Sequence, residues 1–342
     1  MRCLALADFL RAGGADTLFV ASQLPETLAA RIRQGGHELR LVEGGQDREP
    51  EKGRLAHSHW LAGSQIEDAR ATTSAIARLD IDWLIVDHYG LDAQWESLVR
   101  PATRHLLAID DLADRRHACD VLLDQNYYGD AALRYRNLVQ PETKLLLGPS
   151  FALLRPEFRS ARPKHPREDS GVSRVCICFG GADVPGLSEN AARAVAAADV
   201  NVKIDIVIGP MSARNNGLHT LSERIPNVEM HVSPANVAAL LARADIGIGG
   251  AGSMSWERAC VGLPSLIVVL AENQRHIAED LHVLGAAELL GDARVVTIAE
   301  FRQGFERLVA DGPRRRAMSM TAMNLVDGLG CDRIAAAMKE VT

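Results

Sequence analysis

The chain has 342 residues, a formal net charge of −6 and 47% hydrophobic residues, of which few are aromatic. This length favours two domains, each able to bury a core of its own. The negative charge disfavours a general nucleic-acid binder, because no excess of lysine and arginine is present to neutralise phosphates. No apolar run is long enough to span a bilayer, so no membrane partner is expected.

The start of the chain carries Asp8 and Arg11 and lacks the long hydrophobic core of a signal peptide. The six cysteines are scattered, and none forms a Cys-x-x-Cys pair. Cys176 and Cys178 lie on one predicted strand, and we interpret them as small core residues. These features favour a reducing, cytoplasmic location.

The first half of the chain alternates short apolar strands with helices, which predicts an α/β fold with a mostly parallel sheet. Residues 44–57 are polar and predict a loop. The expected helices are at residues 1–12, 26–34 and 65–79, and the expected strands at 17–22, 37–42, 83–86, 105–109, 121–123 and 144–147.

The order of the first elements is unusual for such a domain. A doubly wound domain normally begins with a strand that becomes central in the sheet, and the loop after that strand meets the ligand. Here the first element is a helix with no capping residue before it. Either the domain begins in this way, or the chain lacks its first strand and first loop; we favour the second explanation.

Residues 155–172 interrupt the alternation with three prolines and many charges, and they predict a linker. We therefore place the first domain at residues 1–154 and the second at residues 173–342. The predicted elements of the second domain are strands at 175–179 and 203–208, a helix at 187–197, a strand–loop–helix–strand unit at 244–274 and a largely helical tail at 301–339.

The unit at residues 244–274 carries the strongest functional signal. Its glycine loop leads into a helix, which gathers free backbone N–H groups at the positive end of the helix dipole and suits a phosphate. Glu257 follows Ser253 by one helical turn, so both side chains can face one ligand. A carboxylate at this place can accept hydrogen bonds from a ribose diol. Gly250, Gly252, Ser253 and Glu257 therefore predict a site for a nucleoside diphosphate or a sugar that carries one.

Two further groups in the second domain follow predicted strands, where ligands of open α/β sheets bind. Asn273 and Gln274 come after the strand at 265–270, and Gly180 and Gly181 come after the strand at 175–179. The two glycines can present N–H groups to the ligand or can merely turn the chain. We favour the first interpretation and include all four residues in the predicted site.

In the first domain, Asp87, His88 and Tyr89 follow the buried strand at 83–86. They can contact a ligand or form a hydrogen-bonded strand end. Asp110 and Asp111 resemble a paired-carboxylate site, but no matching cluster supplies further ligands, so we expect them to cap the next turn.

The remaining motifs argue against other enzyme classes. The arginines at 314–316 are most simply a solvated face. Neither His-Glu-x-x-His nor Gly-x-Ser-x-Gly occurs, so neither a zinc site nor a serine hydrolase is predicted. We expect no metal, no cofactor and a monomeric protein.

Ten segments, in chain order, resemble one known family. They are MRCLALAD at 1–8, HWLAGSQIEDA at 59–69, LIVDHYGLD at 84–92, LLAIDDLADR at 106–115, VLLDQN at 121–126, LLLGPSFALLRPEF at 145–158, CFGGAD at 178–183, GGAGSMSWERACVGLPS at 249–265, LAENQ at 270–274 and LVDGLG at 325–330. The chain resembles the UDP-2,4-diacetamido-2,4,6-trideoxy-β-L-altropyranose hydrolases of pseudaminic acid biosynthesis.

This resemblance implies two Rossmann-like domains facing across a cleft, as in glycosyltransferase-B folds such as the lipid II-forming N-acetylglucosaminyltransferase. It implies that water attacks the anomeric carbon of a UDP-sugar without a metal, and that UDP leaves with inversion. In the family, the C-terminal glycine loop holds the diphosphate. Glu257 matches the glutamate that holds the ribose, Asn273 matches a substrate-contacting asparagine, and Tyr89 matches an active-site tyrosine.

One feature departs from the family. Its catalytic histidine lies in a Gly-x-Gly-His loop just before the segment that matches residues 1–3, so this general base is absent from the sequence, as are the first strand and its loop. A start codon placed at an internal methionine would explain both. His88 is the nearest substitute base, but it follows a different strand, and we do not expect it to replace the histidine. The alternatives are a glycosyltransferase of the same fold with a UDP-sugar donor, and a catalytically impaired nucleotide-sugar binder.

Overall fold

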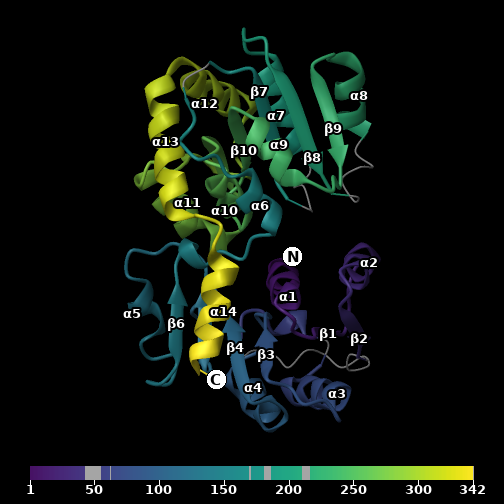
Figure 1. The fold of residues 1–342 in the computed structure, drawn as a ribbon. Coiled ribbons are helices and arrows are strands. Elements are labelled where there is room, and N and C mark those ends of the chain that lie inside the picture. The colour runs from purple at the N-terminus through teal and green to yellow at the C-terminus, as the bar shows by residue number, and fades with distance from the viewer. Residues whose placement is uncertain (43–54, 62, 169–170, 181–185, 210–215, 342) are drawn as a thin grey trace. The chain divides into compact units, whose positions relative to one another are not determined.

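The computed structural model describes residues 1–42, 55–61, 63–168, 171–180, 186–209 and 216–341 (Figure 1). These residues form two compact units, which we describe separately. Unit 1 combines Met1–Leu153 with Gly330–Thr342, and unit 2 is Leu154–Leu329. No helix of the described chain combines the length and the apolar character needed to cross a bilayer.

Unit 2 contains one six-stranded parallel sheet whose spatial order is β12-β11-β10-β7-β8-β9. In chain order this is 3-2-1-4-5-6 read from β9, the strand order of a dinucleotide-binding Rossmann fold. The strands are β7 (Arg174–Cys178), β8 (Lys203–Ile208), β9 (Val228–Val232), β10 (Ile246–Gly250), β11 (Ser265–Val269) and β12 (Glu288–Asp292).

Helices cover both faces of this sheet, which explains why its strands are apolar on both sides. Ile177, Ile206 and Ile248 pack in one cluster with side chains from α7, α8 and α12. Cys176 and Cys178 alternate with this set and are also buried, so their interpretation as core residues is confirmed. The helices of unit 2 are α6 (Pro156–Ala161), α7 (Leu187–Ala196), α8 (Asn216–Arg224), α9 (Val237–Arg243), α10 (Met254–Cys260), α11 (Arg275–Val283), α12 (Ile298–Ala310) and α13 (Gly312–Leu325), with the 3-10 turn η5 (Glu272–Gln274).

Close packing explains the glycines of β10. Gly249 pairs with Cys178 of β7, and a Cβ atom at Gly249 would lie only 2.2 Å from the carbonyl oxygen of Cys178. A Cβ atom at Gly250 would lie 2.4 Å from Cδ1 of Leu270. Both distances are far below van der Waals contact. A side chain at Gly249 would have to displace the backbone of β7, whereas one at Gly250 would have to displace the side chain of Leu270.

Unit 1 contains two parallel sheets, one of β1 and β2 and one of order β3-β4-β5-β6. Among the described residues, β1 pairs only with β2, and β3 pairs only with β4. The absence of a first strand and loop stays a prediction. The strands are β1 (Leu18–Ala21), β2 (Glu38–Leu41), β3 (Trp83–Val86), β4 (His105–Ile109), β5 (Val121–Asp124) and β6 (Lys144–Leu147).

The larger sheet of unit 1 also has two covered faces. Leu107 and Ile109 pack with Leu6 of α1 and with Ile334 of α14, whereas Leu106 and Ala108 pack in a second cluster with Trp95. The predicted loop at residues 44–57 lies mostly outside the described residues. The helices are α1 (Arg2–Ala12), α2 (Glu26–Gln34), α3 (Gln65–Ile76), α4 (Ala93–Val99), α5 (Ala131–Tyr135) and α14 (Gly330–Val341), with 3-10 turns η1 (Ser58–Trp60), η2 (Arg100–Ala102) and η3 (Pro149–Phe151).

The units differ from the predicted domains in two places. Residues 330–342, predicted to lie in the second domain, belong to unit 1 and include α14. Much of the predicted linker at 155–172 packs in unit 2, where residues 156–161 form α6. Arg167 donates to the carbonyls of Ala242 and Val261 at the ends of α9 and α10. A guanidinium satisfies such carbonyls well, because they are unpaired and lie at the negative end of each helix. A charge that contributed to the prediction of a linker therefore binds carbonyl groups within unit 2.

We expect Gly249→Ala to destabilise unit 2 by about 2 kcal/mol or more, because the new methyl group must displace the backbone of β7. Urea unfolding followed by circular dichroism would measure this. Gly129→Ala is the matched control, since a Cβ atom there meets nothing within 4 Å. Equal stabilities of the two variants would show that the strands can separate without cost.

Candidate functional site

The predicted ligand residues of unit 2 follow three neighbouring strands of its sheet. Gly180 follows β7, Gly250 ends β10 and is followed by residues 251–253, and Asn273 follows β11. Because the strands are parallel, all three groups lie at the same edge. The chain leaves β7 and β10 in opposite directions across the sheet, so their ends flank the topological switch point, where ligands bind in open α/β sheets.

The glycine loop between β10 and α10 offers backbone donors. The N–H groups of Ser255 and Trp256 already donate to the carbonyls of Gly252 and Ser253, at 2.8 and 3.1 Å. A ligand would therefore be met by the preceding N–H groups, from Gly252 to Met254. The hydroxyl of Ser253 is exposed and makes no side-chain cap, which leaves it available to the same ligand. Since α10 has only seven residues, we attribute most of the site to these local donors rather than to a long helix dipole.

The segment after β11 lies beside this loop. A Cβ atom at Gly252 would be 3.0 Å from Nε2 of Gln274, and Oε1 of Gln274 accepts the N–H of Leu270 at 3.3 Å. Gln274 therefore fixes the spacing between the two loops. Asn273 is exposed. The structure thus brings together the residues predicted after β10 and β11, in agreement with their placement at one sheet edge.

Glu257 is partly buried, and among the described residues its carboxyl group is influenced by burial and by nearby charges but by no hydrogen bond. Burial raises the pKa of its carboxyl to about 7, although the positive charges of Arg155 and Arg258 oppose this. A carboxylate with free lone pairs in a partly desolvated place is a strong acceptor for ligand hydroxyl groups. This geometry suits the predicted contact with a ribose diol.

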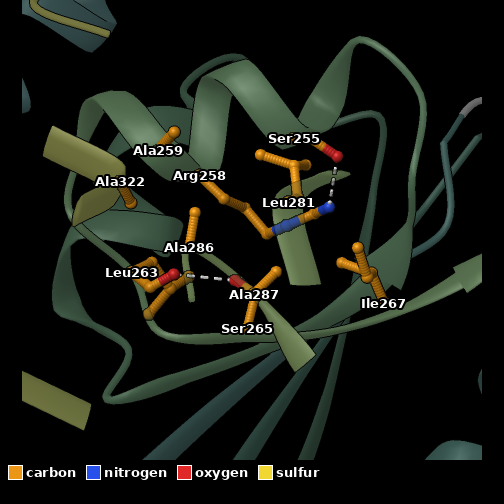
Figure 2. A pocket seen from close by; sticks show the side chains of 10 residues that line it. All are labelled: Ser255, Arg258, Ala259, Leu263, Ser265, Ile267, Leu281, Ala286, Ala287 and Ala322. Carbon is orange, nitrogen blue, oxygen red and sulfur yellow. Dashed lines mark hydrogen bonds between the residues drawn. The ribbon is translucent and has the colours of Figure 1, made fainter. Parts of the chain in front are cut away.

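Arg258 is a residue of this region that the sequence reasoning did not single out. Its guanidinium is buried and donates to the Gly250 carbonyl at 2.7 Å and to the Ser255 hydroxyl at 3.1 Å. Arg258 also lines a small cavity together with residues of β11, α11 and α13 (Figure 2). Its Nη1 atom has no partner among the described residues. Burial lowers the pKa of Arg258 to about 10. The sequence signal that could have identified Arg258 is a charged residue placed in a helix among neighbours that are buried.

Gly180 has a φ of +105°, a backbone conformation that favours glycine. This conformation fits a simple turn of the chain as well as the predicted ligand contact, so it does not distinguish between these two roles of Gly180. Gly181 lies outside the described residues, as do the residues that follow it up to 185.

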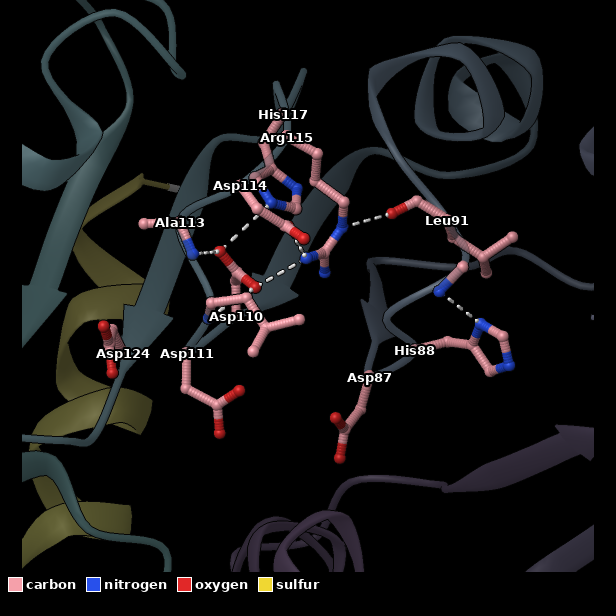
Figure 3. Close-up of polar contacts among 12 residues, drawn as sticks. Asp87, His88, Leu91, Asp110, Asp111, Ala113, Asp114, Arg115, His117 and Asp124 are labelled. Carbon is pink, nitrogen blue, oxygen red and sulfur yellow. Dashed lines mark hydrogen bonds and ion pairs between the residues drawn. The ribbon is translucent and has the colours of Figure 1, made fainter. Parts of the chain in front are cut away.

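In unit 1, Asp87, His88 and Tyr89 follow β3, and their side chains make different contacts. Asp87 and His88 leave the strand end in different directions (Figure 3). Nδ1 of His88 accepts the N–H of Gly90 at 3.0 Å, so the ring nitrogen with the lone pair is engaged, which argues against His88 as a general base. Burial lowers the pKa of His88. Tyr89 is half-buried, and burial together with the charge of Asp111 raises the pKa of its phenol, which stays protonated.

Arg2 links the ends of β3 and β4. Its guanidinium binds both oxygens of Asp87, at 2.6 and 2.9 Å, and Oδ2 of Asp111 at 2.9 Å. The pKa of Asp87 is lowered because Arg2 outweighs the opposing effect of burial. Oδ1 of Asp111 is buried and has no partner among the described residues. The Asp111 carboxylate also interacts with the Tyr89 hydroxyl, whereas the sequence predicted only a capping role for Asp111.

Asp110 does cap the following turn, as predicted. Its carboxylate accepts the N–H groups of Leu112 and Ala113, at 3.2 and 2.9 Å, and forms an ion pair of 2.8 Å with Arg115.

Behind this turn lies a buried ion cluster. His117 contacts Glu96 at 2.7 Å and Asp110 at 3.6 Å. Burial opposes protonation of His117, but the two carboxylates prevail and raise its pKa to about 9. This cluster holds the loop that carries Arg115 beneath the ring of Tyr89, 5.8 Å from Cζ to the ring centroid.

One group of potential metal ligands occurs among the described residues, namely Asp205, Glu229 and His231. Arg174 and Arg243 bind the two oxygens of Asp205, each at 2.8 Å. Two guanidinium groups would repel a cation, so we interpret this group as a salt-bridge network across β8 and β9.

Comparisons with known proteins agree with this fold. No protein-family model matches the chain. It is 25% identical to the spore coat polysaccharide biosynthesis protein SpsG of Bacillus subtilis over 84% of this chain and 85% of that protein. It is 28% identical to the UDP-2,4-diacetamido-2,4,6-trideoxy-β-L-altropyranose hydrolase of Campylobacter jejuni over 57% of this chain and 69% of that protein.

Among solved structures, Acinetobacter baumannii MurG is similar with a TM-score of 0.65 and 15% identity, and the calicheamicin glycosyltransferase CalG4 with 0.60 and 17%. These matches cover 99% of this chain and 95% of each of those proteins. At such identities they establish the fold alone. The chain has the glycosyltransferase-B fold, and the prediction of two Rossmann-like α/β domains is confirmed.

The pKa of Glu257 predicts a pH-dependent affinity for UDP. Only the ionised carboxylate accepts both ribose hydroxyls, so we expect affinity to rise by up to about tenfold from pH 6 to pH 8. The diphosphate also titrates in this range, and Glu257→Gln is therefore the control. Calorimetric titrations should give a flatter pH profile for the variant, and parallel profiles would exclude a contact with Glu257.

The raised pKa of His117 predicts a loss of stability in alkali. Because its pKa rises from about 6.5 in the unfolded chain to about 9 in the fold, the stabilisation is complete below pH 6.5 and is lost as pH rises through 9. Urea unfolding at pH 7, 8 and 9 should show the decline. In His117→Gln the decline should be smaller, and an unchanged slope would assign it to other groups.

Proposed function

We propose that this protein binds a UDP-linked sugar and hydrolyses it at the anomeric carbon, releasing UDP. The observation that carries the proposal is the approach of Gly252 to Gln274, which sets the glycine loop beside the segment after β11 at the carboxyl edge of a sheet with Rossmann strand order. Glu257 lies on the helix that follows this loop, and Asn273 precedes Gln274. Backbone N–H groups suit the diphosphate, and the carboxylate suits the ribose. Similarity to the Campylobacter hydrolase supports hydrolysis of the UDP-sugar.

The proposed substrate is UDP-2,4-diacetamido-2,4,6-trideoxy-β-L-altropyranose, on the path to pseudaminic acid. Its UDP would occupy Gly250–Ser253 and Glu257, with Asn273 and Gln274 beside it. Tyr89 remains protonated at neutral pH and is the proposed sugar-contacting hydroxyl in unit 1. Because Nδ1 of His88 already accepts a hydrogen bond, we assign none of these residues as the general base.

We expect the protein to release UDP and free sugar from this substrate without a metal, because the charge of the leaving UDP is met by backbone dipoles. Release of UDP can be followed with a coupled assay and the free sugar by NMR. EDTA should leave the rate unchanged. Loss of activity with EDTA, restored by a divalent cation, would contradict the metal-free mechanism.

A glycosyltransferase is the second candidate, favoured by the similarity of the fold to the calicheamicin glycosyltransferase CalG4 across nearly the whole chain. It would deliver the sugar to an acceptor instead of water. Radiolabelled sugar that appears on an added acceptor, rather than as free sugar, would support this function. Calorimetric affinity for UDP without turnover of any kind would instead indicate a nucleotide-sugar binder.

A further inference from the structure

A cluster of aromatic rings adjoins Tyr89 in unit 1. The ring centroids of His57 and Trp60 lie 4.8 Å apart, those of His57 and Tyr89 lie 5.4 Å apart, and those of Trp60 and Tyr89 lie 5.6 Å apart. Although it makes these contacts, the Trp60 side chain is 55% exposed. The cluster therefore presents a large indole surface to solvent.

The backbone holds this cluster in place. The 3-10 turn η1 is closed by the hydrogen bond from the Trp60 N–H to the His57 carbonyl, at 3.0 Å. A Cβ atom at Gly90 would lie 3.0 Å from that same carbonyl. The lack of a side chain at Gly90 thus lets the turn approach the loop after β3. Trp60 is consequently fixed beside Tyr89 at the carboxyl end of a strand, where ligands of α/β sheets bind.

The surroundings of these rings are polar rather than apolar. Nδ1 of His57 and Oδ1 of Asp111 are buried and have no partner among the described residues. The guanidinium carbon of Arg115 lies 5.8 Å from the ring centroid of Tyr89. An apolar partner would leave such groups unsatisfied, at a cost in free energy. A sugar instead offers C–H groups to an aromatic face and hydroxyl or amide groups to polar neighbours.

We propose that Trp60, together with His57 and Tyr89, forms the surface on which the sugar ring of the nucleotide sugar stacks. This inference rests on the proposed function and deepens it, because it names a sugar-binding surface in unit 1. Trp60 is a specificity-determining residue in this scheme. It contacts the sugar and contributes nothing to binding of the nucleotide.

The test compares UDP with UDP-N-acetylglucosamine in calorimetric titrations of the full chain. Trp60→Ala should weaken binding of the UDP-sugar about five- to tenfold and change UDP affinity less than about twofold. Trp60→Phe should recover most of the loss, because it restores an aromatic face. Leu133→Ala is the matched control, since Leu133 is 62% exposed in the same unit, and it should change neither affinity.

Equal weakening of both ligands by Trp60→Ala, or no weakening of either, would overturn the proposal. So would wild-type protein that binds UDP-N-acetylglucosamine no more tightly than UDP. If neither nucleotide binds, the proposed function fails, and saturation-transfer NMR with free methyl N-acetylglucosaminide decides the sugar surface separately. Signals that vanish in Trp60→Ala would support it, and their absence in the wild type would refute it.

Discussion

The close approach of β7 and β10 is the constraint on which unit 2 depends. Because Gly249 has no side chain, the two strands can pair where a Cβ atom would otherwise meet the carbonyl of Cys178. Pairing at this point places the ends of both strands at the switch point of the sheet. Arg258 fills the space beneath, with Nη1 2.7 Å from where that Cβ atom would be. Packing and ligand geometry therefore share the same few residues.

Arg258 also places a buried positive charge next to the glycine loop. A buried cation is costly unless an anion or several dipoles compensate it. Here the Gly250 carbonyl and the Ser255 hydroxyl provide partial compensation, and one nitrogen remains without a partner among the described residues. A diphosphate bound at the loop would reduce this cost. The proposed ligand would thus stabilise the structure that binds it.

The sequence predicted those features that follow from local rules. Alternating apolar strands and helices predicted parallel β-structure in both units, and the glycine loop predicted the strand ends that meet in unit 2. Long-range partners could not be predicted in this way. Nothing local links Arg2 to Asp87 and Asp111, which are 85 and 109 residues away. The charges at 155–172 misled for the same reason, since Arg167 has its carbonyl partners at the ends of two later helices.

The two units accordingly present different kinds of recognition. In unit 2 the predicted nucleotide contacts are largely backbone groups, which depend on glycines and on strand order more than on side-chain identity. Such a site is compatible with the same fold in proteins of 15% identity. In unit 1 the polar groups beside Tyr89 belong to side chains fixed by salt bridges, and single substitutions can replace them. Under the proposed function, specificity for the sugar therefore depends mainly on unit 1, and affinity for the nucleotide depends mainly on unit 2.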